Sequence, residues 1–398
     1  MNTAYKLHGI HRHYEWGGKT FIPQLMQLEN VNGTPFAEYW MGAHPSAPAL
    51  METAEGKVPL DQIIQDNQIQ YLGARTAERF GSLPYLFKIL DVEKMLSIQV
   101  HPSKENAEKG FHKENLAGVP IDASHRNYKD QNHKPEVMVA LSDFWLLHGF
   151  MPATDLKERL ASLTPLNALL PLFGVDDYAG LYSYFMHLDA TAADAILKPL
   201  LEIAIQEVAA GKVDKSHPHW WANKYYGGIV PTSNIDKGIL SIYILNIVNV
   251  PKYHGVFQGA GLLHAYLEGQ NIELMANSDN VLRGGLTPKH IDIEELLQHV
   301  YFEPTQPRIL NGDSIHDNEL QFPCPVPDFG LTKIQLSISE TYTNETSSFE
   351  MFLVMQGAVK LNGIDLQPGE LAGVIAGATY QILQVGSEQA VLFKSFVP

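Results

Sequence analysis

The spacing of apolar residues changes twice along this chain of 398 residues, and that change limits the folds open to it. From about Pro84 to Val100 the sequence reads as apolar strands, and near the end of this region apolar residues alternate with polar ones, as on a strand with one buried face. The alternating apolar positions there are Leu96, Ile98 and Val100. Between Pro152 and Ala222 the spacing becomes helical, and β-type runs return after Gly238. The pattern predicts a mainly β fold interrupted by a helical insert.

Several shorter segments refine this expectation. The polar stretch 103–134 predicts a long excursion containing some helix, and 239–250 reads as strand. Asp292 followed by Glu295 has the form of a capping box and predicts the start of a short helix. The proline-rich segment 309–327 resembles a linker, and Asn362-Gly363 predicts a hairpin turn in a final β block.

Two segments of the β regions echo each other. Residues 251–264 align without gaps on residues 368–381, with Gln381 in the place of His264. An internal duplication and two hairpins that merely share turn chemistry both explain this similarity, and the sequence leaves the choice open.

Charge and composition exclude several classes of function. Acidic residues outnumber basic ones by 44 to 28, and no basic run could follow a nucleic-acid backbone, so nucleic acid is not expected as a partner. A small phosphorylated ligand stays compatible, because a few cations in a cleft outweigh a diffuse acidic surface at short range. Cys324 is the only cysteine, and no secretory signal or membrane span is recognisable, so a cytoplasmic protein is expected.

A small set of polar residues has the chemistry of a divalent-metal site. Gln99 and His101 lie two positions apart on a predicted strand and therefore project from the same face. Glu136 opens an apolar strand, and His264 lies on a short strand bounded by glycines. Histidine nitrogens with amide and carboxylate oxygens suit Zn²⁺. Taken singly, each residue is equally well explained as ordinary polar surface or as a hydrogen-bonded structural group.

Longer phrases carry a family resemblance. FKIL, LSIQVHPSKENA, NYKDQNHKPEVMVAL, LLHAYLEG, ELMANSDNVLRGGLTPKH and EYWMGAHPSAPA occur in this order from near the N-terminus onward. Together they resemble the type I mannose-6-phosphate isomerases over essentially the whole length. The resemblance implies a cupin (jelly-roll) catalytic domain with one Zn²⁺ per subunit held by Gln99, His101, Glu136 and His264. It also implies that Arg283 is a catalytic cation.

The resemblance implies further roles and a domain plan. The candidates for the proton carrier are His133, Glu273 and Asp279. Lys134 is expected near the reaction, and with Lys88 and Ser97 it is a candidate contact for the phosphate; Trp16 and Tyr266 are expected to wall the sugar. The expected division is a catalytic domain in 1–150 and 230–315, a helical insert in 151–229, and a second cupin-like β domain in 316–398.

The implied reaction interconverts mannose 6-phosphate and fructose 6-phosphate through a cis-enediol, a step that serves GDP-mannose synthesis. The expected enzyme is a monomer that acts on a small sugar phosphate and binds neither nucleic acid nor membrane. One alternative is another cupin reaction, such as metal-dependent oxygenation. Another is a non-catalytic cupin that binds metal and sugar phosphate.

Overall fold

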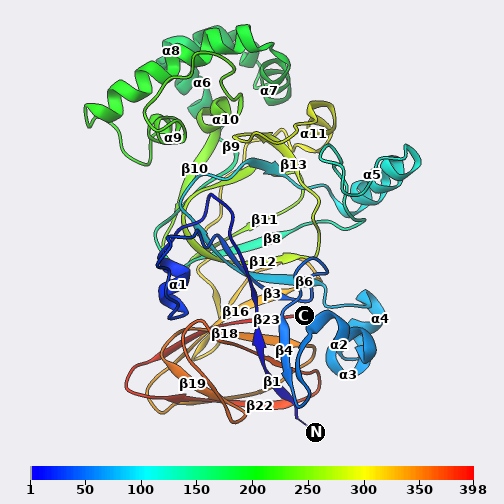
Figure 1. The fold of residues 1–398 in the computed structure, drawn as a ribbon. Coiled ribbons are helices and arrows are strands. Elements are labelled where there is room, and N and C mark those ends of the chain that lie inside the picture. The colour runs from blue at the N-terminus through cyan, green and yellow to red at the C-terminus, as the bar shows by residue number, and fades with distance from the viewer. Residues whose placement is uncertain (1) are drawn as a thin grey trace.

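The computed structural model describes residues 2–398, and in this range the strands form three antiparallel sheets (Figure 1). The central sheet contains β2 (Ile10–Arg12), β3 (Glu38–Gly42), β6 (Tyr85–Val92), β7 (Ile98–Val100), β8 (Glu136–Ala140), β9 (Phe144–Phe150), β10 (Leu245–Val250), β11 (Gly255–Gln258), β12 (His264–Ala276) and β13 (Leu282–Gly285). The terminal sheet contains β1 (Ala4–His8), β4 (Leu50–Thr53), β5 (Gly56–Pro59), β14 (Asp313–His316), β15 (Glu319–Phe322), β16 (Gly330–Leu336), β18 (Glu350–Gln356), β21 (Leu371–Val374) and β23 (Ala390–Phe396). The small sheet contains β17 (Thr341–Glu345), β19 (Ala358–Leu361), β20 (Ile364–Leu366) and β22 (Thr379–Val385).

The helices lie at the margins of these sheets. They are α1 (Phe21–Leu25), α2 (Leu60–Asp66), α3 (Gln68–Leu72), α4 (Ala74–Phe80), α5 (Lys104–Leu116), α6 (Ala153–Ser162), the 3₁₀ helix η1 (Thr164–Phe173), α7 (Tyr178–His187), α8 (Ala190–Ala209), α9 (Pro218–Tyr225), α10 (Gly238–Ile244) and α11 (Ile293–His299). None of the helices in residues 2–398 combines the length and the apolar character that crossing a bilayer requires. The mainly β composition predicted from the sequence is confirmed.

Strand β12 organises the central sheet. It pairs along its length with β6 and β8, and its first residues pair with β7 and β9. All eight residues of β6 are buried, because one face packs on the terminal sheet and the other faces the interior of the central sheet. Consequently the polar side chains of these strands that point inward meet one another in a protected space.

The predicted helical insert is present and covers one end of the molecule (Figure 1). Leu156 and Leu160 of α6 are buried, as are Leu200, Leu201 and Ala204 of α8, which lie at the helical spacing seen in the sequence. These residues share one apolar cluster with β7 and with the first residues of β12. The insert therefore supports the strands that carry the candidate metal ligands.

Two predictions made from short sequence signals, the start of a helix and a hairpin turn, are confirmed. Asp292 accepts a hydrogen bond from the backbone N–H of Glu295 at 3.0 Å and caps α11. Asn362 and Gly363, with φ of 43° and 89°, connect β19 to β20, as expected for a tight hairpin. Helix α5 occupies part of the predicted excursion at 103–134 and begins after Ser103, whose hydroxyl caps it.

Two expectations were wrong in part. The run 239–250 begins as helix α10, every residue of which is buried; a fully apolar segment gives no period by which helix and strand differ. The supposed linker 309–327 contains strands β14 and β15, which pair with each other and extend the terminal sheet. Strands β1 and β4, near the N-terminus, also belong to the terminal sheet.

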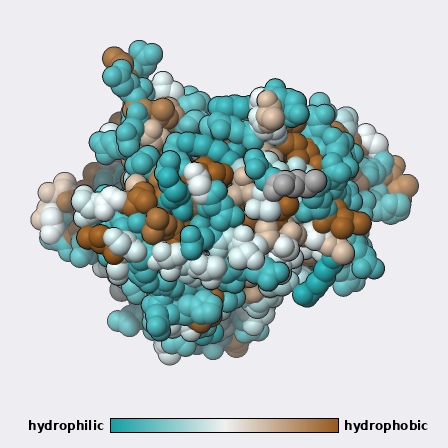
Figure 2. Space-filling view, turned by 90° about the horizontal axis from the view of Figure 1, so that it is seen from below, coloured by the Kyte–Doolittle hydropathy of each residue, from teal (hydrophilic) through white to brown (hydrophobic). Residues whose placement is uncertain are grey.

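The face at the terminal-sheet end is largely hydrophilic. Figure 2 shows it from below, with apolar residues scattered among hydrophilic ones. Scattered apolar residues are normal on the surface of a folded protein, so this face gives no sign of a broad contact area.

Candidate metal centre and adjoining cleft

Three buried side chains converge where β8, β12 and the end of β7 meet. Nε2 of His101 lies 3.4 Å from Oε1 of Glu136, and Nε2 of His264 lies 3.6 Å from Oε2. The possible ligand atoms of the three residues all lie within 4.8 Å of one another. A tetrahedral zinc ion with bonds near 2.0–2.2 Å holds its ligand atoms about 3.4 Å apart. The spacing therefore fits one shared ion better than direct hydrogen bonds.

Hydrogen bonds on the far side of each ring aim the two histidines at this point. Nδ1 of His101 lies 3.0 Å from the carbonyl oxygen of Asn280, and Nδ1 of His264 lies 2.9 Å from that of Leu262. A carbonyl at Nδ1 requires the proton there and leaves the Nε2 lone pair free for a metal. Nε2 of His101 is buried and has no hydrogen-bond partner among residues 2–398. The site thus offers a nitrogen whose lone pair has no partner and can bind a metal ion.

The protonation states suit a cation. Burial lowers the pKa of His101 to about 4, so its ring is neutral. Burial alone would raise the pKa of Glu136, but the charge of Lys134 and the contacts with His101 and His264 outweigh it and hold this pKa well below its usual range. Neutral imidazoles and an ionised carboxylate are the forms that bind metals.

Gln99 lies on β7, between the strands that carry His264 and Arg283. In the antiparallel pairings of β7, it stands opposite His264 on one side and opposite Arg283 on the other. Its side chain lines a small chamber of about 70 Å³ together with Glu136 and His264. Its amide nitrogen lies 3.4 Å from the hydroxyl of Ser97. The strand pairing therefore brings Gln99, the predicted fourth ligand, into the chamber that Glu136 and His264 also line.

The small chamber adjoins a larger cleft of about 470 Å³. Both spaces are lined by Glu38, Lys88, Leu96, Gln99 and Lys134. The cleft is also lined by Tyr14, Trp16, Trp40, Ser97, Asp279, Arg283 and Lys289. Four cations against two carboxylates give the cleft a positive balance within an acidic protein, which favours an anionic ligand.

Arg283 is half-buried in the cleft and unpaired. Within residues 2–398 its guanidinium makes no hydrogen bond and no ion pair, and burial lowers its pKa from the ordinary value. Lys289 lies near enough for its own pKa to be lowered, first by burial and then by the charge of Arg283. Two unneutralised cations side by side are costly unless an anion joins them.

Lys88 is held by buried acids. Its Nζ lies 2.9 Å from Oε2 of Glu273 and 3.9 Å from Oε2 of Glu38. Burial disfavours the lysine charge, but the two carboxylates outweigh it and raise its pKa above the usual value. Tyr266 donates to Oε1 of Glu273 at 2.9 Å and lines the small chamber. Lys88 therefore carries a fixed positive charge at the junction of the two spaces.

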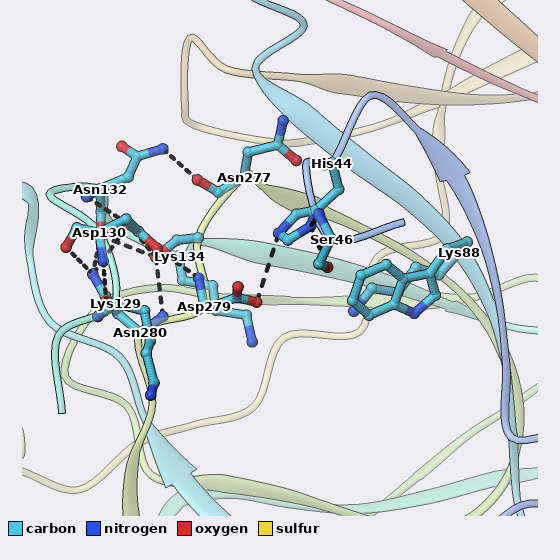
Figure 3. Close-up of polar contacts among 12 residues, drawn as sticks. His44, Ser46, Lys88, Lys129, Asp130, Asn132, Lys134, Asn277, Asp279 and Asn280 are labelled. Carbon is cyan, nitrogen blue, oxygen red and sulfur yellow. Dashed lines mark hydrogen bonds and ion pairs between the residues drawn. The ribbon is translucent and has the colours of Figure 1, made fainter. Parts of the chain in front are cut away.

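The remaining sequence candidates fall into different places. Trp16 and Ser97 line the cleft, as does Asp279, whose carboxylate is 3.6 Å from His44 (Figure 3). Lys134 lies 3.4 Å from Glu136 at the border of both spaces. His133 is not brought to either space: its ring points to Asp328, with Nε2 3.1 Å from both carboxylate oxygens.

Sequence reasoning missed several residues of the cleft. Glu38, Trp40 and Lys289 line it, and Glu38 belongs to the buried group around Lys88. All three lie inside the phrases EYWMGAHPSAPA and ELMANSDNVLRGGLTPKH, so the signal was present. The sequence did not indicate which side chains of β3 point into the cleft. Every residue of β3 is buried, so no alternation of apolar and polar residues marks an inward face.

Comparisons with known proteins agree with this site. Residues 4–153 match the family model "Phosphomannose isomerase type I, catalytic domain". Mannose-6-phosphate isomerase of Escherichia coli K12 is 37% identical over 92% of this chain and 93% of its own length, and that of Macaca fascicularis is 32% identical over 87% and 86%. Among solved structures, mannose-6-phosphate isomerase from Salmonella typhimurium bound to fructose 6-phosphate and zinc superposes with a TM-score of 0.87 at 33% identity, covering 100% of both chains. This chain belongs to the type I phosphomannose isomerase family.

Proposed function

We propose that this chain is a zinc-dependent isomerase that interconverts mannose 6-phosphate and fructose 6-phosphate. The observation that carries the proposal is the buried group His101, Glu136 and His264 beside a cleft with a positive balance of charge. Relatives that share about a third of the sequence over nearly the whole chain are named for this activity, and one related structure holds zinc with fructose 6-phosphate.

Zinc would be held by His101, Glu136 and His264, with Gln99 as the fourth protein ligand. The observed spacing of the donor atoms and the free Nε2 of His101 support this set. When bound, zinc acts as a Lewis acid that stabilises negative charge on sugar oxygens. Four protein ligands also speak against oxygen chemistry, which usually leaves positions open around two histidines and one carboxylate.

The reaction moves a proton between C2 and C1 of the sugar through a cis-enediol whose oxygens become negatively charged. Arg283 is the cation we assign to that charge, because its guanidinium is half-buried, unpaired among residues 2–398 and permanently protonated. Lys88 and Lys134 stand at the junction of chamber and cleft, and with Ser97 they provide contacts for the anionic substrate. Trp16 lines the cleft as a wall for the sugar, whereas Tyr266 acts from the chamber by holding Glu273.

Two carboxylates are the candidates for carrying the proton. Glu273 lines the chamber and Asp279 lines the cleft, whereas His133 faces Asp328 and is set aside. Glu273→Gln and Asp279→Asn separate the two. The variant that loses exchange of the substrate C2 proton with solvent, while still binding substrate, identifies the carrier.

A coupled assay of mannose 6-phosphate conversion, with and without a chelator, tests the proposal. We expect turnover that the chelator abolishes and that added Zn²⁺ restores. Absence of turnover with any divalent metal, together with retained binding of sugar phosphate, would favour a non-catalytic cupin instead.

We further propose that the central sheet is the cupin barrel of the catalytic domain. In this division the helical insert is residues 151–229, the catalytic segments are 1–150 and 230–315, and the second cupin-like domain is 316–398. Strands β1, β4 and β5 of the first catalytic segment join the terminal sheet, which links the two domains. We also propose a cytoplasmic monomer, in keeping with the single cysteine and the hydrophilic face in Figure 2.

A further inference from the structure

Asn280 is a fully buried amide that joins two loops from distant parts of the sequence (Figure 3). Its Oδ1 accepts hydrogen bonds from the backbone N–H groups of Lys129 at 2.7 Å and Asp130 at 3.2 Å. Its Nδ2 donates to the carbonyl oxygens of Asp130 at 2.9 Å and Asn132 at 2.8 Å. The amide thus uses its two donors and both acceptor positions on one loop.

Asp130 in turn accepts hydrogen bonds from the loop that contains Asn280. Its Oδ2 accepts from the backbone N–H of Asp279 at 2.8 Å, and its Oδ1 accepts from the hydroxyl of Ser278 at 2.9 Å and from Nδ2 of Asn280 at 3.2 Å. Hydrogen bonds to a carboxylate are stronger than those between neutral groups. The two side chains therefore lock residues 129–132 against residues 278–280.

The two locked loops lead directly into the candidate metal centre. The first continues into β8, which begins at Glu136, and the second continues into β13, which carries Arg283. The backbone carbonyl of Asn280 is also the oxygen that faces Nδ1 of His101 at 3.0 Å. One residue therefore touches the ring of one ligand and the loop that precedes another.

We propose that Asn280 is a positioning residue of the metal centre and that Asp130 is its partner. Asn280 sets the tautomer and orientation of His101 through its carbonyl, and its amide fixes the distance between the loops that deliver Glu136 and Arg283. It lines neither the chamber nor the cleft, so it acts on metal and substrate only through these residues. The inference rests on the proposed zinc site and adds the part of the protein that holds the site in place.

Asn280→Asp is the informative change, and Asn277→Asp is its matched control. In Asn280→Asp a carboxylate oxygen replaces the amide nitrogen that faces the carbonyls of Asp130 and Asn132, so both hydrogen bonds become repulsions. Asn277 lies in the same turn, but its Nδ2 donates to the carbonyl of Leu83 at 2.6 Å. The control thus places the same new charge in the same turn without touching the contacts of Asn280.

The measurement is the zinc dissociation constant of the purified protein, by competition with a chromophoric chelator, together with kcat, KM and the urea unfolding midpoint. Substitutions of such supporting groups weaken metal binding by roughly 10- to 100-fold. We expect a loss in this range for Asn280→Asp with a fall in kcat and little change in KM, and zinc binding within twofold of the parent for Asn277→Asp. Asp130→Asn combined with Asn280→Asp should recover part of the loss, because only one of the two facing negative charges remains and the repulsion between them is gone.

Zinc binding that stays within twofold of the parent in folded Asn280→Asp overturns the proposal. So does an equal loss in the control, since that would reflect general destabilisation. Ser278→Ala is a milder variant that removes one contact of Asp130, and if Asn280→Asp does not fold, a severalfold loss of zinc affinity in Ser278→Ala at unchanged fold supports the inference and no loss rejects it. A parent protein that neither binds zinc nor turns over mannose 6-phosphate would refute the proposed function instead.

Discussion

Gln99 stands directly opposite His264 across the antiparallel pairing of β7 with β12. This pairing joins two residues that lie far apart in the sequence, and it makes the depth of the two side chains in the chamber interdependent. The two residues nevertheless differ in chemistry, because an imidazole nitrogen binds Zn²⁺ more strongly than a neutral amide oxygen.

That difference gives the first prediction. His264→Ala should lose nearly all bound zinc after dialysis, whereas Gln99→Ala should retain zinc with reduced affinity, since three stronger ligands remain. Metal content per chain, measured by atomic absorption, checks both. His316→Ala removes an exposed histidine of β14 and should keep the zinc content of the parent. Full zinc content in His264→Ala would remove this residue from the ligand set.

Arg283→Ala should keep zinc and substrate binding but lose turnover. By comparison with oxyanion-stabilising donors, its removal should raise the barrier by roughly 3–4 kcal/mol and lower kcat by about 10²- to 10³-fold. Steady-state kinetics with a parallel zinc determination measure this. Arg308→Ala, which removes an exposed arginine outside the cleft, is the control. A kcat near that of the parent would show that Arg283 does not stabilise the reacting oxygens.

The free energy of unfolding should depend on pH because of Glu350, a buried carboxyl group of the terminal sheet. Burial raises the pKa of this carboxyl to about 7, against the opposing charge of Lys394 and with a smaller contribution from Glu319. In the folded protein Glu350 therefore keeps its proton at pH values where the unfolded chain has lost it. The resulting stabilisation is fully present below the ordinary pKa of 4.5 and disappears as pH rises through 7, a change on the order of 3 kcal/mol.

Glu350→Gln, which stays neutral, should not show this loss. Urea unfolding at pH 5 and pH 8 should find the variant gaining stability relative to the parent at the higher pH. Glu345→Gln changes an exposed carboxylate on β17 and should follow the parent. If the stability difference between Glu350→Gln and the parent is the same at both pH values, the folded-state pKa of Glu350 is not raised.

Gly285→Ala should damage both stability and activity. Gly285 has φ of 127°, and a Cβ there would lie 2.4 Å from Cα of Gly238 in α10. The clash and the unfavourable backbone conformation should cost more than about 2 kcal/mol, and displacement of β13 should lower kcat because Arg283 lies two residues earlier. Gly211→Ala, at φ of 64° with nothing within 4 Å, tests the conformational cost alone. Urea unfolding and kinetics of both variants check the prediction.

The structural elements that could be predicted from the sequence are those set by a few neighbouring residues. The site residues that could be predicted lie in phrases typical of the family. The helical insert, the cap at Asp292 and the turn at Asn362 each depend on a few neighbouring residues. The four proposed metal ligands were named from their chemistry and from family phrases, and Arg283 from a phrase alone. His101, Glu136 and His264 converge, Gln99 lines the chamber with Glu136 and His264, and Arg283 lines the adjoining cleft. Their roles remain proposals for the experiments above.

Features that depend on long-range contacts were not predictable in the same way. Nothing near Asn280 in the sequence indicates that its amide meets residues 129–132, and nothing near His133 indicates that its ring meets Asp328. Helix α10 was taken for strand because it is apolar on every side. In each case the structure depends on contacts with residues that are distant in the sequence, and one sequence alone does not show which distant residues meet.

The pairing of β1 with β21 has a consequence for how the chain is made. Ala4 stands opposite Val374, so β1 leaves the ribosome long before its partner β21 has been synthesised. At ordinary rates of translation that interval is on the order of tens of seconds. During this interval the edge of β1 that later pairs with β21 has no hydrogen-bond partner, and it can pair with a strand of another chain. This edge can therefore pair with other chains during synthesis, whereas in the folded protein β21 covers it.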